Sequence, residues 1–315
     1  MFKWLFCIIV CISICLFAAV PLMAEDPYLT GTLLKDTIAH KGMERSFLVY
    51  MPDGDISGKP LIMVLHGSKG TGEDIRKQSG YQFDVLADTE KFAVVYPDGY
   101  KNHWNGCRNA PKDAAHKKDI DDVGFLLALT DLCAGRWHTD PAVIYAAGFS
   151  NGAHMCYRLA MEAPGRIAGI AAIAAGIPAP GWSKCSGPEK HVPVMIVNGT
   201  DDPINPYEGG MVRLFLLIKK GEVLSTMESA RFWLLPEDLN KQPVTMQMED
   251  RDPDDKTHVE TLTWPASRVR LYTVHGGGHT IPGGRQYLPR AVIGTTSQDM
   301  DIAQEVWKFL VVPGR

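Results

Sequence analysis

The chain has 315 residues, of which 45% are hydrophobic and 22% are charged. This length fits one large α/β domain or two small ones, and the composition is that of a globular protein with a sizeable core. The formal net charge of −4 gives no reason to expect nucleic acid or an anionic membrane surface as a partner.

The N-terminal segment has the pattern of a secretory signal. An apolar stretch over 4–20 follows Lys3, and Ala24 is a small residue at the expected cleavage point. We therefore expect a signal peptide at 1–24, a single catalytic domain over 25–315, and a secreted or periplasmic protein. The apolar stretch is long and has one lysine before it, so an uncleaved membrane anchor is the alternative. Without such an anchor we expect no stable membrane partner.

The segment after the predicted signal peptide is expected to form an antiparallel hairpin that leads into a parallel sheet. Residues 31–51 alternate in polarity around a turn at 40–42 and predict a β-hairpin. Continuous apolar runs predict buried strands at 61–65 and 92–96, and the pattern over 74–91 predicts a helix between them.

The middle of the chain continues this alternation. Residues 97–107 show no periodicity and predict a surface loop over the site. Asp121 and Asp122 are expected to cap a helix. A strand over 143–147 then leads directly into Gly148-Phe149-Ser150-Asn151-Gly152 and a helical pattern. Strands separated by helices predict an α/β fold with a mainly parallel central sheet, an antiparallel N-terminal hairpin and helices on both faces.

The last third has a looser pattern. Buried strands are expected at 192–197 and 269–274, a helix at 225–235, and a hairpin from 244–248 and 259–264. The acidic run 249–255 lacks the glycine and glutamate positions of a calcium loop, so it predicts a solvated turn. No spacing of histidines or cysteines indicates a metal, and we expect no metal and no cofactor.

Ser150 is the candidate nucleophile. A Gly-x-Ser-x-Gly segment between a strand and a helix is typical of the nucleophile elbow, a strained turn that holds a serine hydroxyl above the sheet. A Cβ on either glycine would collide with the neighbouring strand or helix in such a turn.

A serine hydroxyl needs a base, an orienting acid and oxyanion donors to react at neutral pH. His279 follows three glycines after the strand at 269–274 and is the candidate base. Asp202 and Asp201 both follow the strand at 192–197, and spacing alone does not decide which is the acid. All these residues follow predicted parallel strands, so they can converge at the carboxyl edge of the sheet.

The oxyanion donors are expected to be two backbone amides. One is that of Asn151, directly after the nucleophile, and the other is that of Ser68, in the turn after the strand at 61–65. Trp104 and Tyr207 are candidates for lining the substrate pocket, although aromatic residues at such a site can equally be structural. His66 is expected to be a structural loop residue rather than a second base.

Four cysteines lie after the N-terminal segment, and an exported protein can keep disulfides. Cys107 and Cys185 are expected in loops at the active-site edge of the sheet and are the preferred pair. Cys133 and Cys156 fall in helical patterns and are expected to be free, buried thiols, although connectivity cannot be read from a sequence.

Six segments together resemble the secreted polyhydroxybutyrate-depolymerase and feruloyl-esterase-like group of α/β-hydrolases. They are 65–67, 104–105, 121–125, 148–152, 202–207 and 276–284. The resemblance covers nearly all of the chain after residue 30. In that family the acid is the aspartate directly before a proline, which here is Asp202. The chain departs from the family at Ile281, where tryptophan is usual, and at Asn198, where histidine is usual, which leaves the exact acyl or alcohol pocket open.

The resemblance implies an exported serine carboxylesterase that hydrolyses aryl or short-chain esters, feruloyl esters among them. A depolymerase or oligomer hydrolase for polyhydroxyalkanoates and an acetyl xylan esterase are the alternatives. The expected partner is thus an ester substrate, either an ester on plant polysaccharide or a polyester oligomer. A peptidase is a weaker alternative, because such enzymes of this fold usually carry a gating domain. A non-catalytic protein that binds carbohydrates or esters on the same scaffold is the alternative from another class.

Overall fold

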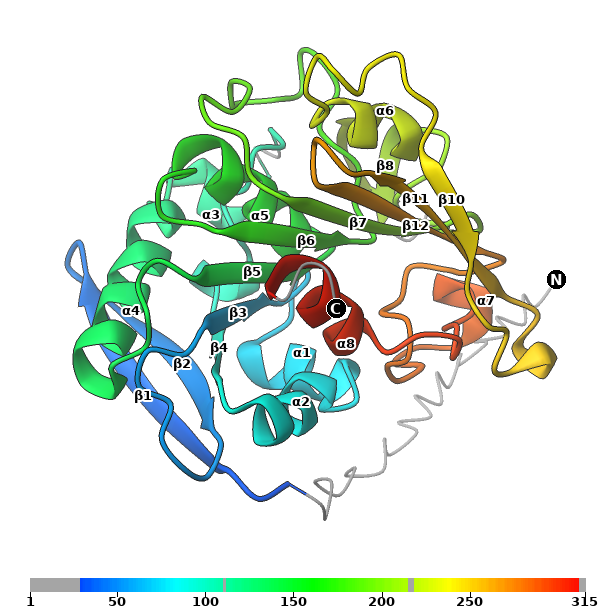
Figure 1. Cartoon of the computed structure of the whole chain (residues 1–315). Helices are drawn as coiled ribbons and strands as arrows, with labels where there is room; N and C mark the ends of the chain where they lie inside the picture. Colours follow the sequence, from blue (N-terminus) through cyan, green and yellow to red (C-terminus); the bar gives the residue numbers. More distant parts are fainter. Residues whose placement is uncertain (1–28, 110–111, 215–217, 312–315) are drawn as a thin grey trace, which may run out of the picture.

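A computed structural model describes residues 29–109, 112–214 and 218–311. The predicted signal peptide at 1–24 lies outside these residues. A ten-stranded sheet, in the order β1-β2-β4-β3-β5-β6-β7-β12-β11-β10, forms the centre of the molecule (Figure 1). Its strands are β1 (Thr32–His40), β2 (Met43–Met51), β3 (Leu61–Leu65), β4 (Ala93–Pro97), β5 (Ile144–Phe149), β6 (Gly169–Ile173), β7 (Val194–Gly199), β10 (Val244–Gln247), β11 (His258–Trp264) and β12 (Val269–His275).

The middle of this sheet is parallel and its edges are antiparallel. The pairs β4–β3, β3–β5, β5–β6, β6–β7 and β7–β12 are parallel. The β1–β2 hairpin joins one edge through the antiparallel pair β2–β4, and β11 and β10 extend the other edge. This arrangement confirms the predicted α/β-hydrolase fold class. A separate two-stranded sheet of β8 (Gly210–Leu214) and β9 (Ile218–Val223) was not predicted.

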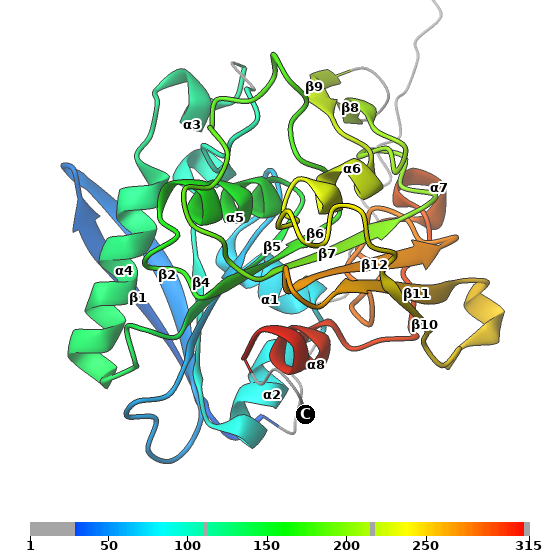
Figure 2. The same cartoon turned by 45° about the horizontal axis from the view of Figure 1, so that its top comes forward.

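Helices cover both faces of the central sheet. Figures 1 and 2 show α4, α5 and α6 on one face and α1, α2 and α8 on the other. The α-helices are α1 (Gly72–Gln78), α2 (Gln82–Glu90), α3 (Ala114–Lys117), α4 (Asp122–Trp137), α5 (Asn151–Glu162), α6 (Thr226–Arg231), α7 (Arg290–Ile293) and α8 (Ile302–Val306). Short helical turns occur at Tyr100–Asn102, Pro253–Asp255 and Trp307–Val311.

Successive side chains of strand β3 pack alternately into the two core clusters, one on each face of the sheet. Leu61, Met63 and Leu65 belong to the core cluster that includes α4 and α5, whereas Ile62 and Val64 belong to the cluster that includes α1, α2 and α8. Successive side chains of a strand point to opposite faces, so a strand covered on both faces must be apolar throughout. The all-buried run at Leu61–Leu65 is that case.

Two predicted elements differ from the structure in the first half of the chain. The helix expected over 74–91 is two helices, broken where Gly80 and Tyr81 take the left-handed conformation, with φ of +66° and +61°. The carbonyl of Gln78, at the end of α1, instead accepts a hydrogen bond from the amide of Arg285 at 2.8 Å. The loop 97–107 is not superficial throughout, because its second half is buried.

Two further expectations need correction in the second half. The helix expected at 225–235 is limited to Thr226–Arg231. The acidic run 249–255 is not wholly solvated, because Asp255 is buried and accepts hydrogen bonds from the amides of Thr257 and Gln298.

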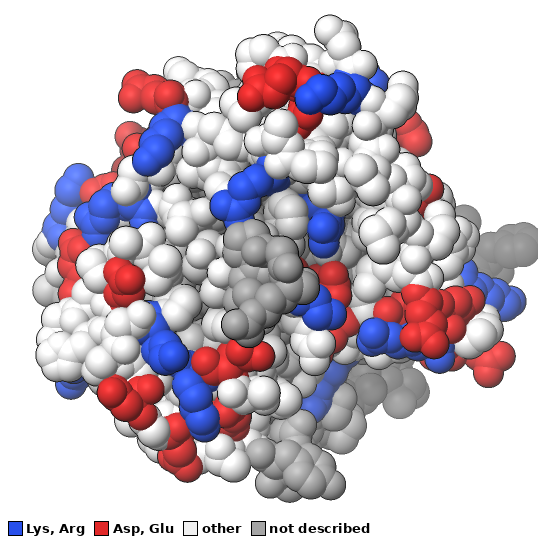
Figure 3. All heavy atoms as spheres, in the orientation of Figure 1, with Lys and Arg blue, Asp and Glu red and all other residues white. Residues whose placement is uncertain are grey.

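The surface carries mixed charge. Figure 3 shows basic and acidic side chains interspersed over the face that it presents. Every helix within the described ranges is too short or too polar to cross a membrane.

Candidate active site

Ser150 lies in a strained turn between β5 and α5. Its φ of 54° and ψ of −112° are costly for a residue with a Cβ. A Cβ added to Gly152 would lie 2.2 Å from the carbonyl oxygen of Leu65, and one added to Gly148 would lie 2.3 Å from that of Gly152. Both contacts are impossible, so the pentapeptide needs glycine at these two positions. The strand-turn-helix context predicted for Ser150 is therefore present.

His279 and Asp202 lie on adjacent loops that pack backbone against backbone. A Cβ added to Gly199 would lie 2.2 Å from the carbonyl oxygen of Gly277, so glycine makes this approach possible. His279 Nδ1 lies 2.7 Å from Asp202 Oδ2, and His279 Nε2 lies 3.0 Å from Ser150 Oγ. Because a carboxylate only accepts hydrogen bonds, Nδ1 carries the proton and Nε2 accepts from the serine hydroxyl.

The two aspartates that the sequence offered have different surroundings. Asp202 is buried, and its Oδ1 accepts hydrogen bonds from the amides of Ile204 and Asn205 at 2.7 and 2.8 Å. Asp201 is exposed, and its carboxylate accepts from the hydroxyl of Thr200. The structure thus places Asp202, and not Asp201, against the imidazole.

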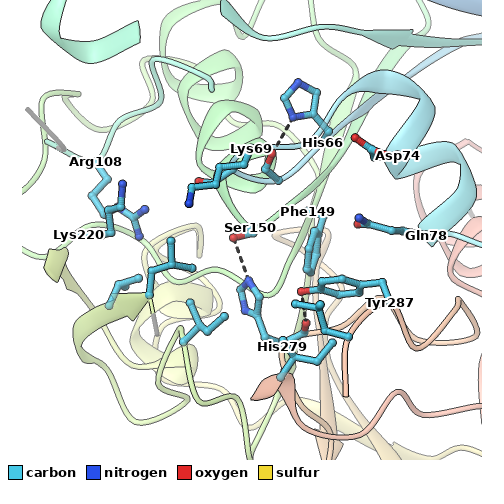
Figure 4. Close-up of a pocket in the computed structure, with 18 residues that line it drawn as sticks. His66, Lys69, Asp74, Gln78, Arg108, Phe149, Ser150, Lys220, His279 and Tyr287 are labelled. Atoms are coloured by element: carbon cyan, nitrogen blue, oxygen red, sulfur yellow. Dashed lines mark hydrogen bonds between the residues drawn. The ribbon is translucent and has the colours of Figure 1, made fainter. Parts of the chain in front are cut away.

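Ser150 and His279 open into a cavity of about 230 Å³. Figure 4 shows the serine hydroxyl and the imidazole facing each other in it. Apolar side chains that line it are Ile204, Val212, Leu214, Leu288 and Ile293. A small, mainly apolar cavity with a few polar groups beside a reactive atom is typical of a substrate pocket.

The two predicted oxyanion residues border this site. Ser68 lines the cavity in the turn after β3, and Asn151 is the first residue of α5. The amides of both residues have no hydrogen-bond partner within the described parts of the chain. The amide of Asn151 also lies at a helix N-terminus, where the backbone dipoles favour negative charge.

Trp104 does not line the cavity. It is fully buried, and its indole Nε1 donates to the carbonyl of His66 at 3.0 Å. Its backbone amide donates to the Asn151 side-chain oxygen at 2.7 Å, and its carbonyl accepts from the same side chain at 3.1 Å. Trp104 therefore links the loop after β3, which contains Ser68, to Asn151 at the start of α5 through hydrogen bonds.

Tyr207 also lies outside the cavity lining. It is half-buried, and its hydroxyl forms a 2.8 Å hydrogen bond with that of Thr273 on β12. Its backbone carbonyl accepts from the amide of Thr226 at the start of α6. These contacts are structural, and its contact with substrate stays a prediction.

Besides His279, three histidines of the described residues are buried, namely His66, His116 and His154. Burial lowers the pKa of His66 and of His116 to about 4 and that of His154 well below its ordinary range. His66 Nε2 accepts from the amide of Gly99 at 2.9 Å, so its Nδ1 carries the proton and donates to the carbonyl of Gly67. Both ring nitrogens are thus occupied, as expected of a structural loop residue.

The predicted disulfide is present between Cys107 and Cys185, with a Cα–Cα distance of 5.2 Å. Cys133 and Cys156 are buried free thiols, as predicted. Within the described residues, no group of three or more histidine, cysteine or acidic side chains is placed to hold a metal ion.

Sequence reasoning missed most of the side chains that line the cavity, among them Phe149, Tyr287, Arg108 and Lys220. The Tyr287 hydroxyl donates to the carbonyl of His279, and the ring of Phe149 lies 5.0 Å from the imidazole. Phe149 stands inside the elbow pentapeptide and could have been noticed there. The other three stand in no motif, and only the folded chain brings them to the site.

Comparisons with known proteins agree with this architecture. Residues 45–200 match the family described as "Esterase PHB depolymerase". The esterase candidate NocK from Nocardia uniformis subsp. tsuyamanensis is 30% identical over 302 residues, which are 90% of this chain and 84% of NocK. Feruloyl esterase C from Emericella nidulans is 25% identical over 172 residues, which are 53% of this chain and 58% of that relative.

The structural comparison supports the fold alone. The acetyl xylan esterase from Aspergillus awamori superposes with a TM-score of 0.54 at 17% identity, over 80% of this chain and 95% of that one. Together with the family match and the likeness to NocK, these findings identify the chain at the level of its family. The chain belongs to the esterase and PHB depolymerase family of ester hydrolases, with an α/β-hydrolase fold.

Proposed function

We propose that the protein is an exported serine carboxylesterase that acts through Ser150, His279 and Asp202. The observation that carries this proposal is the continuous pair of hydrogen bonds, 3.0 Å and 2.7 Å long, that joins the three side chains at the cavity. The residues occur in the chain order serine, acid, histidine that this fold requires.

The geometry supports a two-step acyl transfer. His279 Nε2 takes the proton from Ser150 Oγ as the oxygen attacks the ester carbonyl carbon. Asp202 holds the imidazole in the tautomer with the proton on Nδ1 and stabilises the cation that forms. His279 then gives the proton to the leaving alcohol, and a water molecule hydrolyses the acyl-enzyme by the same route.

The amides of Ser68 and Asn151 are the proposed oxyanion donors. Ser68 lines the cavity, and Asn151 directly follows Ser150. Neither amide has a hydrogen-bond partner among the described residues, so both are available to a developing negative charge. Each donor of this kind is typically worth about 10²–10³ in rate. Trp104 acts through them as a positioning residue.

The small, mainly apolar cavity supports aryl or short-chain esters as substrates. Feruloyl esterase C is named for feruloyl esters, and the matched family for polyhydroxybutyrate, so esters on plant polysaccharide and polyester oligomers are both within the proposal. The Cys107–Cys185 disulfide supports export, since such bonds persist in oxidising compartments. We further propose that 25–315 form one catalytic domain after a cleaved signal peptide.

The test is a hydrolysis panel of methyl ferulate, 4-nitrophenyl acetate, 4-nitrophenyl butyrate and hydroxybutyrate oligomers. Ser150→Ala is expected to lower kcat/KM on every substrate that the wild type hydrolyses, by at least about 10³-fold. Ser57→Ala, which alters an exposed serine outside the cavity, is the matched control and should leave turnover within about twofold. Near-normal turnover by Ser150→Ala would overturn the assignment.

A further inference from the structure

Arg108 is a buried cation that the proposed reaction does not use. Only 6% of its surface is exposed, and it lines the same cavity as Ser150. Its guanidinium has no hydrogen bond or ion pair with any residue of the described ranges, and its Nε is buried without a partner. A buried charge without a partner destabilises a fold, so its presence needs a reason outside folding.

The backbone holds Arg108 in a fixed place. Its neighbour Cys107 is in the disulfide with Cys185, and Arg108 forms an isolated β-bridge with Ser183. Gly221 leaves room for the side chain, because an added Cβ would lie 3.3 Å from Arg108 Cγ. The guanidinium is therefore presented by a rigid support rather than by a loose surface loop.

The charges around Arg108 do not cancel. Lys220 also lines the cavity and forms an ion pair with Asp113, and its side chain is 12% exposed. Asp113 is the acidic group whose charge acts on Arg108, but its hydrogen bond goes to Lys220. Arg108 and Lys220 thus share one carboxylate. Lys69 and Asp74 also line the cavity and their charges are opposite, so one positive charge is left over.

Arg108 keeps that charge at neutral pH. Burial lowers its pKa to about 10, which still leaves the guanidinium protonated. The nearby His116 and His154 are neutral there, because burial lowers the pKa of both. Figure 4 shows Arg108 and Lys220 on the side of the cavity away from Tyr287.

We propose that Arg108, assisted by Lys220, binds a carboxylate of the substrate, so that the preferred substrate is an ester that also carries a free carboxylate group. A planar guanidinium presents paired N–H donors that match the two oxygens of a carboxylate. A single uncompensated charge matches a monoanion. This inference rests on the proposed esterase function and narrows its substrate class.

Two kinds of ester fit this chemistry. A monoester of a dicarboxylic acid carries the carboxylate on its acyl side, and a hydroxy-acid oligoester carries it on its alcohol side. The acyl arm of the test compares mono(4-nitrophenyl) glutarate with its neutral carboxamide analogue. The alcohol arm compares 4-acetoxybenzoate with 4-acetoxybenzamide. In each arm the readout is the ratio of kcat/KM for the anionic ester to that for the neutral ester.

The expected result is a preference for the anionic ester in at least one arm, which falls by about 10- to 100-fold in Arg108→Met. Arg108→Lys should recover part of it. Arg231→Met, which removes an exposed arginine outside the cavity, is the matched control and should keep the wild-type ratio. The thermal midpoint of Arg108→Met should equal or exceed that of the wild type, whereas a structural role would lower it.

The outcomes separate this inference from the proposed function. Hydrolysis of the neutral esters without an anionic preference in either arm would overturn the carboxylate site and leave the esterase standing. A preference that survives Arg108→Met would overturn it too. If no ester is hydrolysed, the esterase fails, and calorimetric titration with the monoanions glutaramate and 4-hydroxybenzoate still decides. Binding of either anion that is lost in Arg108→Met supports the site, and no binding of either refutes it.

Discussion

Replacement of Asp202 by asparagine should leave the fold intact and reverse the tautomer of His279. Asp202 Oδ1 accepts the amides of Ile204 and Asn205, so the oxygen of an asparagine must stay at that position. Its Nδ2 group then faces His279 Nδ1, and two N–H donors cannot face each other. The imidazole proton moves to Nε2, where it points at Ser150 Oγ and can no longer accept the hydroxyl proton.

The expected loss is about 10³- to 10⁴-fold in kcat, or about 4–5.5 kcal/mol of transition-state stabilisation. The assay is steady-state hydrolysis of 4-nitrophenyl acetate at neutral pH, with thermal unfolding to verify the fold. Asp201→Asn is the matched control, since Asp201 is exposed, and it should stay within about threefold of the wild type. Retention of a tenth or more of the activity by Asp202→Asn, or an equal loss in both variants, would refute the reasoning.

Three further predictions concern stability. Gly152→Ala should prevent folding or lower the free energy of unfolding by more than about 3 kcal/mol, because its Cβ would meet a backbone carbonyl at 2.2 Å. Gly135→Ala, in an open helical position of α4, is the control and should raise the free energy of unfolding by about 0.5–1 kcal/mol. Urea unfolding measures both changes. Cys107→Ser combined with Cys185→Ser removes a cross-link between residues 78 apart, and the same titration should give a loss of about 4 kcal/mol; a loss below 1 kcal/mol would contradict this. The pKa of a histidine in the unfolded chain is about 6.5, whereas burial lowers the pKa of His116 in the folded chain to about 4. The unfolded state therefore binds the proton first as the pH falls, and the free energy of unfolding should decrease between these two pH values. His116→Gln should reduce this fall by up to about 3 kcal/mol, and an unchanged pH profile would speak against it.

The sequence predicts the layered architecture well because that information is local. Continuous apolar runs such as 61–65 indicate strands covered on both faces, and the structure has β3 there. The break between α1 and α2 was not predictable in this way. Gly80 alone is tolerated within a helix, and the decisive contact is the hydrogen bond from distant Arg285 to the end of α1.

The central residues of the site are equally accessible from the sequence. Ser150 and His279 are in glycine-rich motifs whose spacing has a steric cause, and the added-Cβ contacts confirm that cause at Gly148 and Gly152. The proline after Asp202 distinguishes it from Asp201 as the candidate acid only because of the family resemblance. Within the structure, burial and hydrogen bonds separate the two directly.

The walls of the cavity are the part that the sequence does not reveal. An aromatic residue in a polar loop can face substrate or the core, and Trp104 packs beneath the site because its indole finds a carbonyl there. Arg108 belongs to no motif, and its place depends on a disulfide, a β-bridge and Gly221, all of which join segments distant in the chain. The lining of the cavity is therefore a tertiary property here.

The most direct test of the central claim is covalent labelling by a fluorophosphonate, followed by intact-mass and peptide mass spectrometry. An activated serine attacks this reagent rapidly, whereas an ordinary serine does not. We expect one phosphonyl group per chain, on the peptide that contains Ser150, and no rapid labelling of Ser150→Ala. Rapid labelling at another residue, or ester hydrolysis by a chain that the reagent leaves unlabelled, would contradict the proposed relay of Ser150, His279 and Asp202.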